Sequence, residues 1–304
     1  MTFSAESQSV EEFLSRAREA TDAALDRALP QLLSGASPDL REAVCYATMG
    51  SGKRFRPALV IAAYQTAGGT HPAIADLAGA VEIVHAYSLV HDDLPCMDND
   101  DLRRGRPTLH RAMGVDVATR AGFAMVAVAA AAVERGAERL GLTAPLTREI
   151  QLVLFRAAGA SGMIGGQVLD LLAVNSVSEL ESVRDLEERK TGALIAASVE
   201  IGALAARAGP DIREAYRAYG RDVGLAFQIA DDVLDLTATA SELGKTPGKD
   251  AKLGKATYPA FLGVEGAQRE AERLAEQAVA HLTAAGVSSP LLAALARFVV
   301  SRRS

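Results

Sequence analysis

The stretch 90–105 holds the side chains of this chain that are best suited to chemistry. After an apolar run it reads Val-His-Asp-Asp-Leu-Pro-Cys-Met-Asp-Asn-Asp-Asp-Leu-Arg-Arg-Gly, so carboxylates and guanidiniums follow one another closely. Like charges held together cost free energy unless a positive ion binds among them. The sequence therefore predicts a divalent-metal site that uses some of the carboxylates Asp92, Asp93, Asp98, Asp100 and Asp101.

A second acidic cluster, Phe-Gln-Ile-Ala-Asp-Asp-Val-Leu-Asp at 227–235, also follows a helical apolar run. Asp231 and Asp235 are four residues apart and so share one face of a helix. Magnesium binds through one or two carboxylates together with water and substrate phosphates. Two such clusters facing each other would hold a diphosphate through bridging ions.

Asp92 and Asp98 are six residues apart, a spacing that a regular helix would not bring onto one side. Pro95 lies between them, and proline interrupts helices. We therefore expect the chain to loop out at Pro95 and return Asp98 to the side of Asp92. A straight helix through this region would contradict that hypothesis.

Three further segments offer cations. The turn Gly-Ser-Gly-Lys-Arg-Phe-Arg-Pro at 50–57 lacks the glycine spacing and the Ser or Thr of a Walker phosphate loop. Beside two acidic clusters it indicates a diphosphate clamp, because Lys and Arg donate charge-assisted hydrogen bonds to phosphate; a solvated basic turn is the alternative. Lys190-Thr191-Gly192 suits either a phosphate contact or a packing glycine, and the lysine-rich segment 237–255 is typical of a lid.

Alanine-rich helical periodicity dominates, which predicts an all-α protein. Ser9 and Glu12 form a capping-box pattern, and Gly165-Gly166 predicts a kink or a close approach inside a helix. His85, seven residues before Asp92, shares a helix face with it, although a core histidine is the simpler reading. The expected helices include 38–49, 58–67, 73–91, 115–140, 146–174, one from 179 to about 190, 258–281 and 290–300.

At 304 residues with 49% hydrophobic side chains, the chain can bury a large core, and without a linker it is expected to be a single domain over 1–304. The net charge of -6 disfavours nucleic acid as a partner. No secretory signal is expected in the polar, acidic first 22 residues. The most apolar window, 121–133, is too short for a membrane span, and two cysteines indicate no disulfide framework, so a cytoplasmic protein is expected.

Together these motifs resemble the trans-isoprenyl diphosphate synthases of the polyprenyl synthetase family, most closely the bacterial-type farnesyl diphosphate synthases. The resemblance runs in order and spacing from about Gly50 to Gly263. It implies an all-α, single-domain helical bundle around a deep central cavity, usually a homodimer. Two aspartate-rich motifs would bind three magnesium ions and an allylic diphosphate.

The resemblance also implies residue roles. The metal ligands would be Asp92, Asp98 and Asp231, and their supporting carboxylates would be Asp93, Asp232 and Asp235. Isopentenyl diphosphate would bind to Lys53, Arg56, His85 and Arg104. The allylic diphosphate would bind to Arg103, Lys190, Thr191, Gln228, Lys245 and Lys255, and Lys190 would also take part in catalysis.

The chemistry so implied is ionisation of an allylic C–O bond, attack by the isopentenyl double bond on the cation, and loss of a proton, in a dry apolar cavity. In this head-to-tail (1'-4) prenyl transfer the allylic substrates would be dimethylallyl and geranyl diphosphate. In this family, bulk beneath the first motif limits product length. Tyr87 and Ser88, five and four residues before Asp92, therefore favour farnesyl diphosphate as the product, with geranylgeranyl diphosphate as the alternative.

One departure from the family pattern is Gly122-Phe123-Ala124-Met125, where Gly-Asp-Ala-Leu is usual. The bulky Phe123 lies in a helix that should face the helix of the first motif, and it could reshape the pocket or weaken catalysis. A non-catalytic regulatory subunit of a prenyl synthase is therefore an alternative, although both acidic motifs are intact. A terpene cyclase shares the fold but would not need the basic turn at 50–57.

Overall fold

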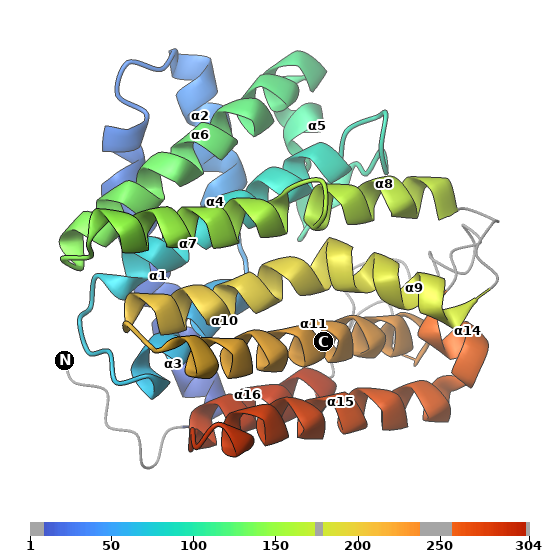
Figure 1. Cartoon of the computed structure of the whole chain (residues 1–304). Helices are drawn as coiled ribbons and strands as arrows, with labels where there is room; N and C mark the ends of the chain where they lie inside the picture. The colour runs from blue at the N-terminus through green and yellow to red at the C-terminus, as the bar shows by residue number, and fades with distance from the viewer. Residues whose placement is uncertain (1–8, 174–178, 238–256, 302–304) are drawn as a thin grey trace. The chain divides into compact units, whose positions relative to one another are not determined.

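The computed structural model describes residues 9–173, 179–237 and 257–301, and these residues are almost entirely helical, as expected (Figure 1). The chain divides into two compact units, Met1–Leu152 and Val153–Ser304, with the division inside one helix, α7. Strands in the described residues are limited to one short antiparallel pair. The expectation of a single domain over 1–304 stays a prediction.

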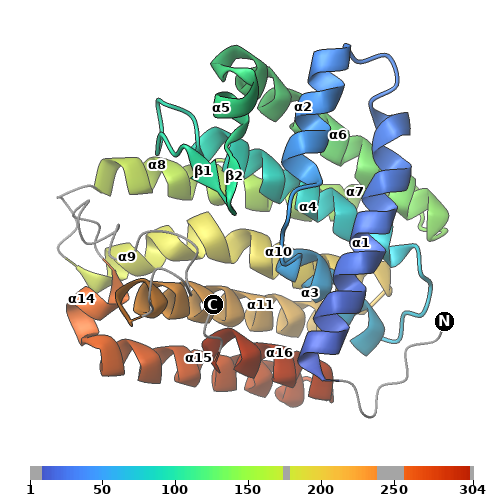
Figure 2. The same ribbon diagram turned by 180° about the vertical axis from the view of Figure 1, so that it is seen from behind.

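The first unit is arranged around the helix α4. This helix is apolar on almost every side and therefore buried, and α1, α2, α3 and α6 all pack against it (Figure 2). The elements of this unit are α1 (Val10–Leu32), α2 (Pro38–Thr48), α3 (Phe55–Thr66), α4 (Ile74–Asp92), β1 (Leu102–Arg103), β2 (Arg106–Pro107), α5 (Leu109–Met113), α6 (Val115–Arg139) and the first part of α7 (Ala144–Ala158).

Helix starts in this unit follow the expected local signals. The Ser9 side chain accepts a hydrogen bond from the backbone N–H of Glu12 at 3.2 Å, which confirms the predicted N-cap of α1. Pro38 occupies the first position of α2, where its missing N–H is not needed. The Ser9 cap therefore sets the start of α1, which packs against α4.

The chain leaves α4 by a tight turn. The helix ends at Asp92, and the backbone N–H of Asp98 donates to the carbonyl oxygen of Asp92 at 2.9 Å, which confirms that no straight helix runs through Pro95. A hairpin of β1 and β2 follows. Its two connecting residues, Arg104 and Gly105, have φ of 52° and 75°, as a tight two-residue hairpin turn requires.

The second unit is arranged around α11, which packs against α10, α15, α16 and α14. Glycines on α11 make this packing close: a Cβ at Gly224 would lie 2.7 Å from the Cα of Gly192, and one at Gly220 would lie 2.6 Å from the Cα of Ala196. The elements are the rest of α7, α8 (Met163–Ala173), α9 (Leu180–Glu187), the π-helical turn η1 (Glu188–Gly192), α10 (Ala193–Ala205), α11 (Pro210–Thr237), α14 (Tyr258–Leu262), α15 (Val264–Ala284) and α16 (Pro290–Ser301).

Three helix boundaries differ from those expected. The predicted helix 146–174 is divided at 159–162, so the kink lies before Gly165-Gly166, although Gly166 does make a close approach to Lys190. The helix entering 190–192 does not break there but widens into η1 and continues as α10. The predicted helix 258–281 is divided at Gly263, whose φ of 69° a helix cannot contain.

Two stretches, Val115–Arg139 and Ala144–Leu172, are long and apolar enough to cross a membrane by length and composition. Both stretches are longer than the window 121–133 from which the sequence analysis argued against a membrane span. The criterion alone is weak evidence for a span. Val115–Arg139 is α6, which packs against α4, and Ala144–Leu172 is divided at 159–162 into α7 and α8.

Candidate functional site

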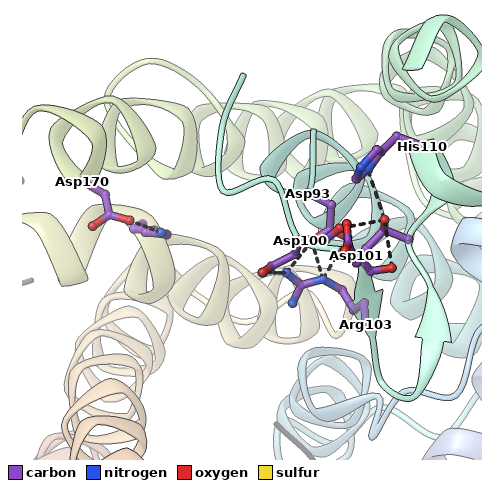
Figure 3. A network of polar contacts seen from close by, with 8 residues as sticks. Asp93, Asp100, Asp101, Arg103, His110 and Asp170 are labelled. Carbon is purple, nitrogen blue, oxygen red and sulfur yellow. Dashed lines mark hydrogen bonds and ion pairs between the residues drawn. The ribbon is translucent and has the colours of Figure 1, made fainter. Parts of the chain in front are cut away.

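Asp93 and Arg103 form an ion pair within the first acidic cluster (Figure 3). Arg103 Nε lies 2.8 and 2.9 Å from the two carboxylate oxygens of Asp93, and Nη2 lies 2.5 Å from Oδ1. Burial raises the pKa of Asp93, although the hydrogen bonds and charge of Arg103 oppose that shift. Arg103 Nη2 is also 3.5 Å from Asp100 Oδ2, so this guanidinium is fixed against the acidic loop.

Thr108 holds the same loop from its other end. Its Oγ1 donates to the carbonyl oxygen of Asp100 at 2.8 Å and lies 3.1 Å from Nδ1 of His110. Asp101 pairs with Arg111 at 2.5 Å. Sequence reasoning assigned no role to Thr108, His110 or Arg111, since nothing in their spacing reveals that they hold this loop in place.

Asp92 and Asp98 are left at the open end of α4, both half-buried, and the backbone hydrogen bond between them keeps them close. Among the described residues there is no group of three or more His, Cys, Asp or Glu side chains placed to hold a metal by itself. Two half-exposed carboxylates nevertheless fit magnesium, because that ion takes one or two protein carboxylates and completes its shell with water and phosphate.

The basic turn lies in the same unit, between α2 and α3. Lys53 is exposed, whereas Arg56 is half-buried with its Nη1 3.4 Å from Nε2 of His85. Burial lowers the pKa of His85 well below its usual value, and Arg56 and Arg104 lower it further, so this imidazole is neutral at pH 7. Burial, Arg54 and Arg103 also lower the pKa of Arg104, against the opposing effect of Glu82.

A pocket of about 70 Å³ adjoins this cluster, lined among others by Gly50, Ser51, Asp93, Arg103 and Arg104. Residues from the basic turn and from the hairpin after the acidic loop therefore border one hollow. Such a mixture of guanidiniums and backbone groups is suited to an anion with several oxygens. The structure thus brings Asp93 of the first acidic cluster together with the predicted cations Arg103 and Arg104 around this pocket.

Tyr87 and Ser88 lie one helical turn before Asp92. Tyr87 is 9% exposed, and its ring meets the edge of the His91 ring with centroids 4.9 Å apart. Burial and the charge of Asp92 raise the pKa of Tyr87. Ser88 Oγ donates to the carbonyl oxygen of His85 at 2.8 Å, so it is a backbone-bonded helix residue.

The helix α6, which carries Phe123, packs against α4 as the sequence suggested, and Phe123 is 68% exposed. Its ring lies edge-on to His91 at 5.6 Å, so Tyr87, His91 and Phe123 form a continuous row of rings. The neighbouring Gly122 makes room for the row, because a Cβ there would lie 1.9 Å from His91 Nε2. Sequence reasoning did not identify His91 as a member of this row.

The second unit contains a relay of hydrogen bonds from η1 to α14. Thr191 Oγ1 donates to Gln228 Oε1 at 3.1 Å, and Gln228 Nε2 donates to Asp232 Oδ1 at 3.2 Å. Asp232 Oδ2 accepts from the backbone N–H of Tyr258 at 3.2 Å. Through Gln228 and Asp232, these hydrogen bonds link η1 and α14 to α11.

Lys190 pairs with Asp170 of α8, with Nζ 2.5 Å from Oδ2 (Figure 3). A π-helical turn is rare and recurs at functional sites, and here η1 presents Lys190 and Thr191 to different neighbours. Of the second acidic cluster, Asp231 is half-buried, whereas Asp235 is only 3% exposed. Lys245 and Lys255 lie outside the described residues.

The sequence model of the polyprenyl synthetase family matches residues 37–288, which is most of the chain and includes both acidic clusters. The chain belongs to this family. The matched range contains every site residue predicted above, from Lys53 to Lys255.

Relatives of this polyprenyl synthetase carry names for different prenyl products. It is 40% identical to geranylgeranyl pyrophosphate synthase 9, chloroplastic, from Arabidopsis thaliana, over 96% of this chain and 81% of that protein. It is 38% identical to a dimethylallyltranstransferase from Fischerella ambigua, over 96% of this chain and 83% of that protein. The apo crystal structure of an FPP/GFPP synthase from Zymomonas mobilis matches with a TM-score of 0.81 and 38% identity, over 94% of this chain and 98% of that one.

Proposed function

We propose that this polyprenyl synthetase catalyses the head-to-tail (1'-4) condensation of isopentenyl diphosphate with dimethylallyl and geranyl diphosphate. The observation that supports the proposal is the turn after α4, in which the Asp98 N–H bonds to the Asp92 carbonyl oxygen and keeps two half-exposed acids close together. The adjacent Asp93 lines a hollow together with Arg103 and Arg104. Neither a structural helix end nor a solvated loop requires that combination of charges.

Binding of isopentenyl diphosphate is assigned to Lys53, Arg56, His85 and Arg104. Arg56 and His85 contact each other, and the neutral imidazole adds a hydrogen-bonding group to the cluster without adding charge. Guanidiniums offer several donors in a fixed fork, which matches the oxygens of a diphosphate. Binding here would orient the double bond without pulling on the diphosphate, because this substrate keeps its C–O bond.

Binding of the allylic diphosphate is assigned to Arg103, Lys190, Thr191 and Gln228, with Lys245 and Lys255 as further candidates from the sequence. Asp93 fixes the orientation of Arg103, and Asp170 fixes that of Lys190. Donors held in place by acids before the substrate arrives need little reorganisation when negative charge develops on the leaving group. Lys190 is for this reason also assigned a catalytic role.

Magnesium would be held by Asp92, Asp98 and Asp231, with Asp93, Asp232 and Asp235 in supporting positions. When bound, magnesium supplies positive charge that stabilises the departing diphosphate. The exposures fit this assignment: the three proposed ligands are half-buried, and the three supporting acids are buried. A supporting acid such as Asp232 keeps the backbone beside a ligand in place by its hydrogen bonds to Gln228 and Tyr258.

Farnesyl diphosphate is the proposed product, because Tyr87 is a buried aromatic residue one turn below Asp92 and would stop a growing chain. Geranylgeranyl diphosphate is the alternative, since a relative named for that product is 40% identical. We further propose a homodimer in the cytoplasm with no nucleic-acid partner. The free thiols of Cys45 and Cys96 are consistent with a reducing compartment.

The test uses purified protein with magnesium, labelled isopentenyl diphosphate and each allylic diphosphate in turn. The prenyl alcohols are identified by chromatography after the diphosphates are removed enzymatically. Alcohols longer than the starter are the expected result. Diphosphate release without chain growth would instead indicate a cyclase, and no consumption of either substrate would indicate a non-catalytic subunit.

A further inference from the structure

Glu82 lies in the apolar middle of α4 and is 2% exposed. Its Oε1 accepts a hydrogen bond from Arg54 Nη1 at 2.6 Å, and Arg54 is itself only 4% exposed. A buried carboxylate costs free energy unless it is paired and hydrogen-bonded. The buried pair of Glu82 and Arg54 is therefore part of the core beneath the basic turn.

Arg54 makes bonds to protein groups with all three of its nitrogens. Besides Glu82, it bonds through Nε to Asp22 at 2.8 Å and through Nη2 to the carbonyl oxygens of Thr48 and Gly50 at 3.0 and 3.1 Å. Its backbone has φ 51° at the start of α3, so the turn is tied down at that residue. Of the cations in this turn, Arg54 therefore points inward and fixes the course of the chain between Gly50 and α3.

Glu82 also acts on the neighbouring guanidinium. A Cβ at Gly52 would lie 2.4 Å from Arg104 Nη1 and 3.0 Å from Arg54 Nη1, so both guanidiniums pack against the bare glycine. The charge of Glu82 raises the pKa of Arg104, against the larger effect of burial and the repulsion of Arg54. One buried anion thus offsets the repulsion between cations that approach from two segments.

We propose that Glu82, acting through Arg54, is a positioning residue for binding of isopentenyl diphosphate: it neutralises the inward arginine so that Lys53, Arg56 and Arg104 are held ready for the diphosphate. This inference rests on the proposed function, which assigns those three residues to that substrate. Glu82 does not touch the substrate. Its charge instead stabilises the arrangement of the residues that do.

The direction of the effect separates positioning from simple charge. If Glu82 were only a nearby negative charge, its removal would make the site more positive and would tighten the binding of a diphosphate. If Glu82 positions the turn, removing its charge turns the charge-assisted hydrogen bond from Arg54 into a weaker one, since charge-assisted bonds are about twice as strong as neutral ones. Arg54 is then held less firmly, and binding of the diphosphate weakens. The two readings predict opposite changes in the same constant.

The experiment is Glu82→Gln in the full chain, which keeps the shape of the side chain and removes its charge. We expect the KM for isopentenyl diphosphate to rise about tenfold, which corresponds to about 1.4 kcal/mol. The KM for geranyl diphosphate and the product length should not change. An unchanged or lowered KM for isopentenyl diphosphate overturns the proposal.

Asp76→Asn is the matched control, because Asp76 is also a nearly buried acid of α4 paired with an arginine, Arg139, at 2.7 Å. It should lower the melting temperature as Glu82→Gln does while leaving both KM values unchanged. A rise in the isopentenyl KM of this control as large as that in Glu82→Gln would mean that loss of core stability explains both, and would overturn the proposal.

Two further variants keep the test decisive. Where Glu82→Gln fails to fold, Asp22→Asn loosens Arg54 from its more exposed side, and an unchanged isopentenyl KM in that variant overturns the proposal. In an Arg54→Lys background, Glu82→Gln should have little further effect if the two residues act as one unit. Wild-type protein that makes no elongated product refutes the proposed function itself, which is a separate outcome.

Discussion

Gly122→Ala should lengthen the product. The new Cβ would lie 1.9 Å from His91 Nε2, whereas non-bonded heavy atoms rest at about 3.5 Å, so the imidazole must move by roughly 1.6 Å. That displacement separates His91 from Tyr87, whose ring it contacts at a centroid distance of 4.9 Å. The ring proposed to stop the growing chain then loses its support.

The size of the effect follows from the lost ring contact. An aromatic pair contributes about 0.5–1.5 kcal/mol beyond its buried area, which corresponds to a change of about 2- to 12-fold in the ratio of two competing outcomes. Here the outcomes are release of the fifteen-carbon product and one further elongation. We therefore expect the ratio of geranylgeranyl to farnesyl diphosphate to rise by that factor, as measured by chromatography of the prenyl alcohols.

The matched control is Gly136→Ala on the same helix, where a Cβ would lie 3.0 Å from the backbone nitrogen of Leu77 on α4. It crowds the contact between α6 and α4 without touching the row of rings, so it should lower stability and leave the product ratio unchanged. Phe123→Leu, which removes only the outer ring, should give a smaller shift than Gly122→Ala. A product ratio that stays constant in Gly122→Ala would refute the reasoning.

Three other predictions concern metal dependence, pH and packing. Asp231→Asn should raise the magnesium concentration needed for half-maximal rate, measured by metal titration, and an unchanged requirement would contradict its assignment as a ligand. Because the pKa of His85 is lower in the folded protein than in the unfolded chain, the unfolded chain binds more protons, so stability should fall as pH drops below about 6.5, and His85→Gln should flatten that dependence in thermal melts. Gly166→Ala would place a Cβ 2.3 Å from the backbone nitrogen of Lys190 and should cost about 1–2 kcal/mol of unfolding free energy, the cost of overpacking less the gain in helix propensity, whereas Gly209→Ala, with open space around it, should be nearly neutral in denaturant titrations.

Periodicity and capping predicted most helices of this chain because both are local properties. The Ser9 cap of α1 and the buried helix α4 follow from residues within one or two turns of each other. The end of α4 was also predictable, since proline interrupts helices and Pro95 lies between Asp92 and Asp98. Local signals therefore located the part of the first unit that carries the predicted metal ligands.

Tertiary packing set the features that sequence reasoning missed. The position of the helix break at 159–162 was missed, whereas the close approach predicted as one alternative for Gly165-Gly166 is found between Gly166 and the backbone of Lys190. Glu82 could have been noticed as an acid inside an apolar run, but its partner Arg54 is 28 residues away in sequence. The contact between His91 and Phe123 likewise depends on how α6 lies against α4.

The wide turn η1 amounts to a one-residue insertion within a continuous helix. Consecutive residues of an α-helix are rotated by about 100°, so if 188–192 closed into a regular α-helix with no residue removed, all of α10 would turn by about that angle. The face of α10 that now meets Gly220 of α11 would then point elsewhere. A single-residue deletion in η1 should therefore keep the packing face of α10, whereas a deletion inside α10 should turn the residues that follow it, and a library of single deletions across both elements would show this difference in stability.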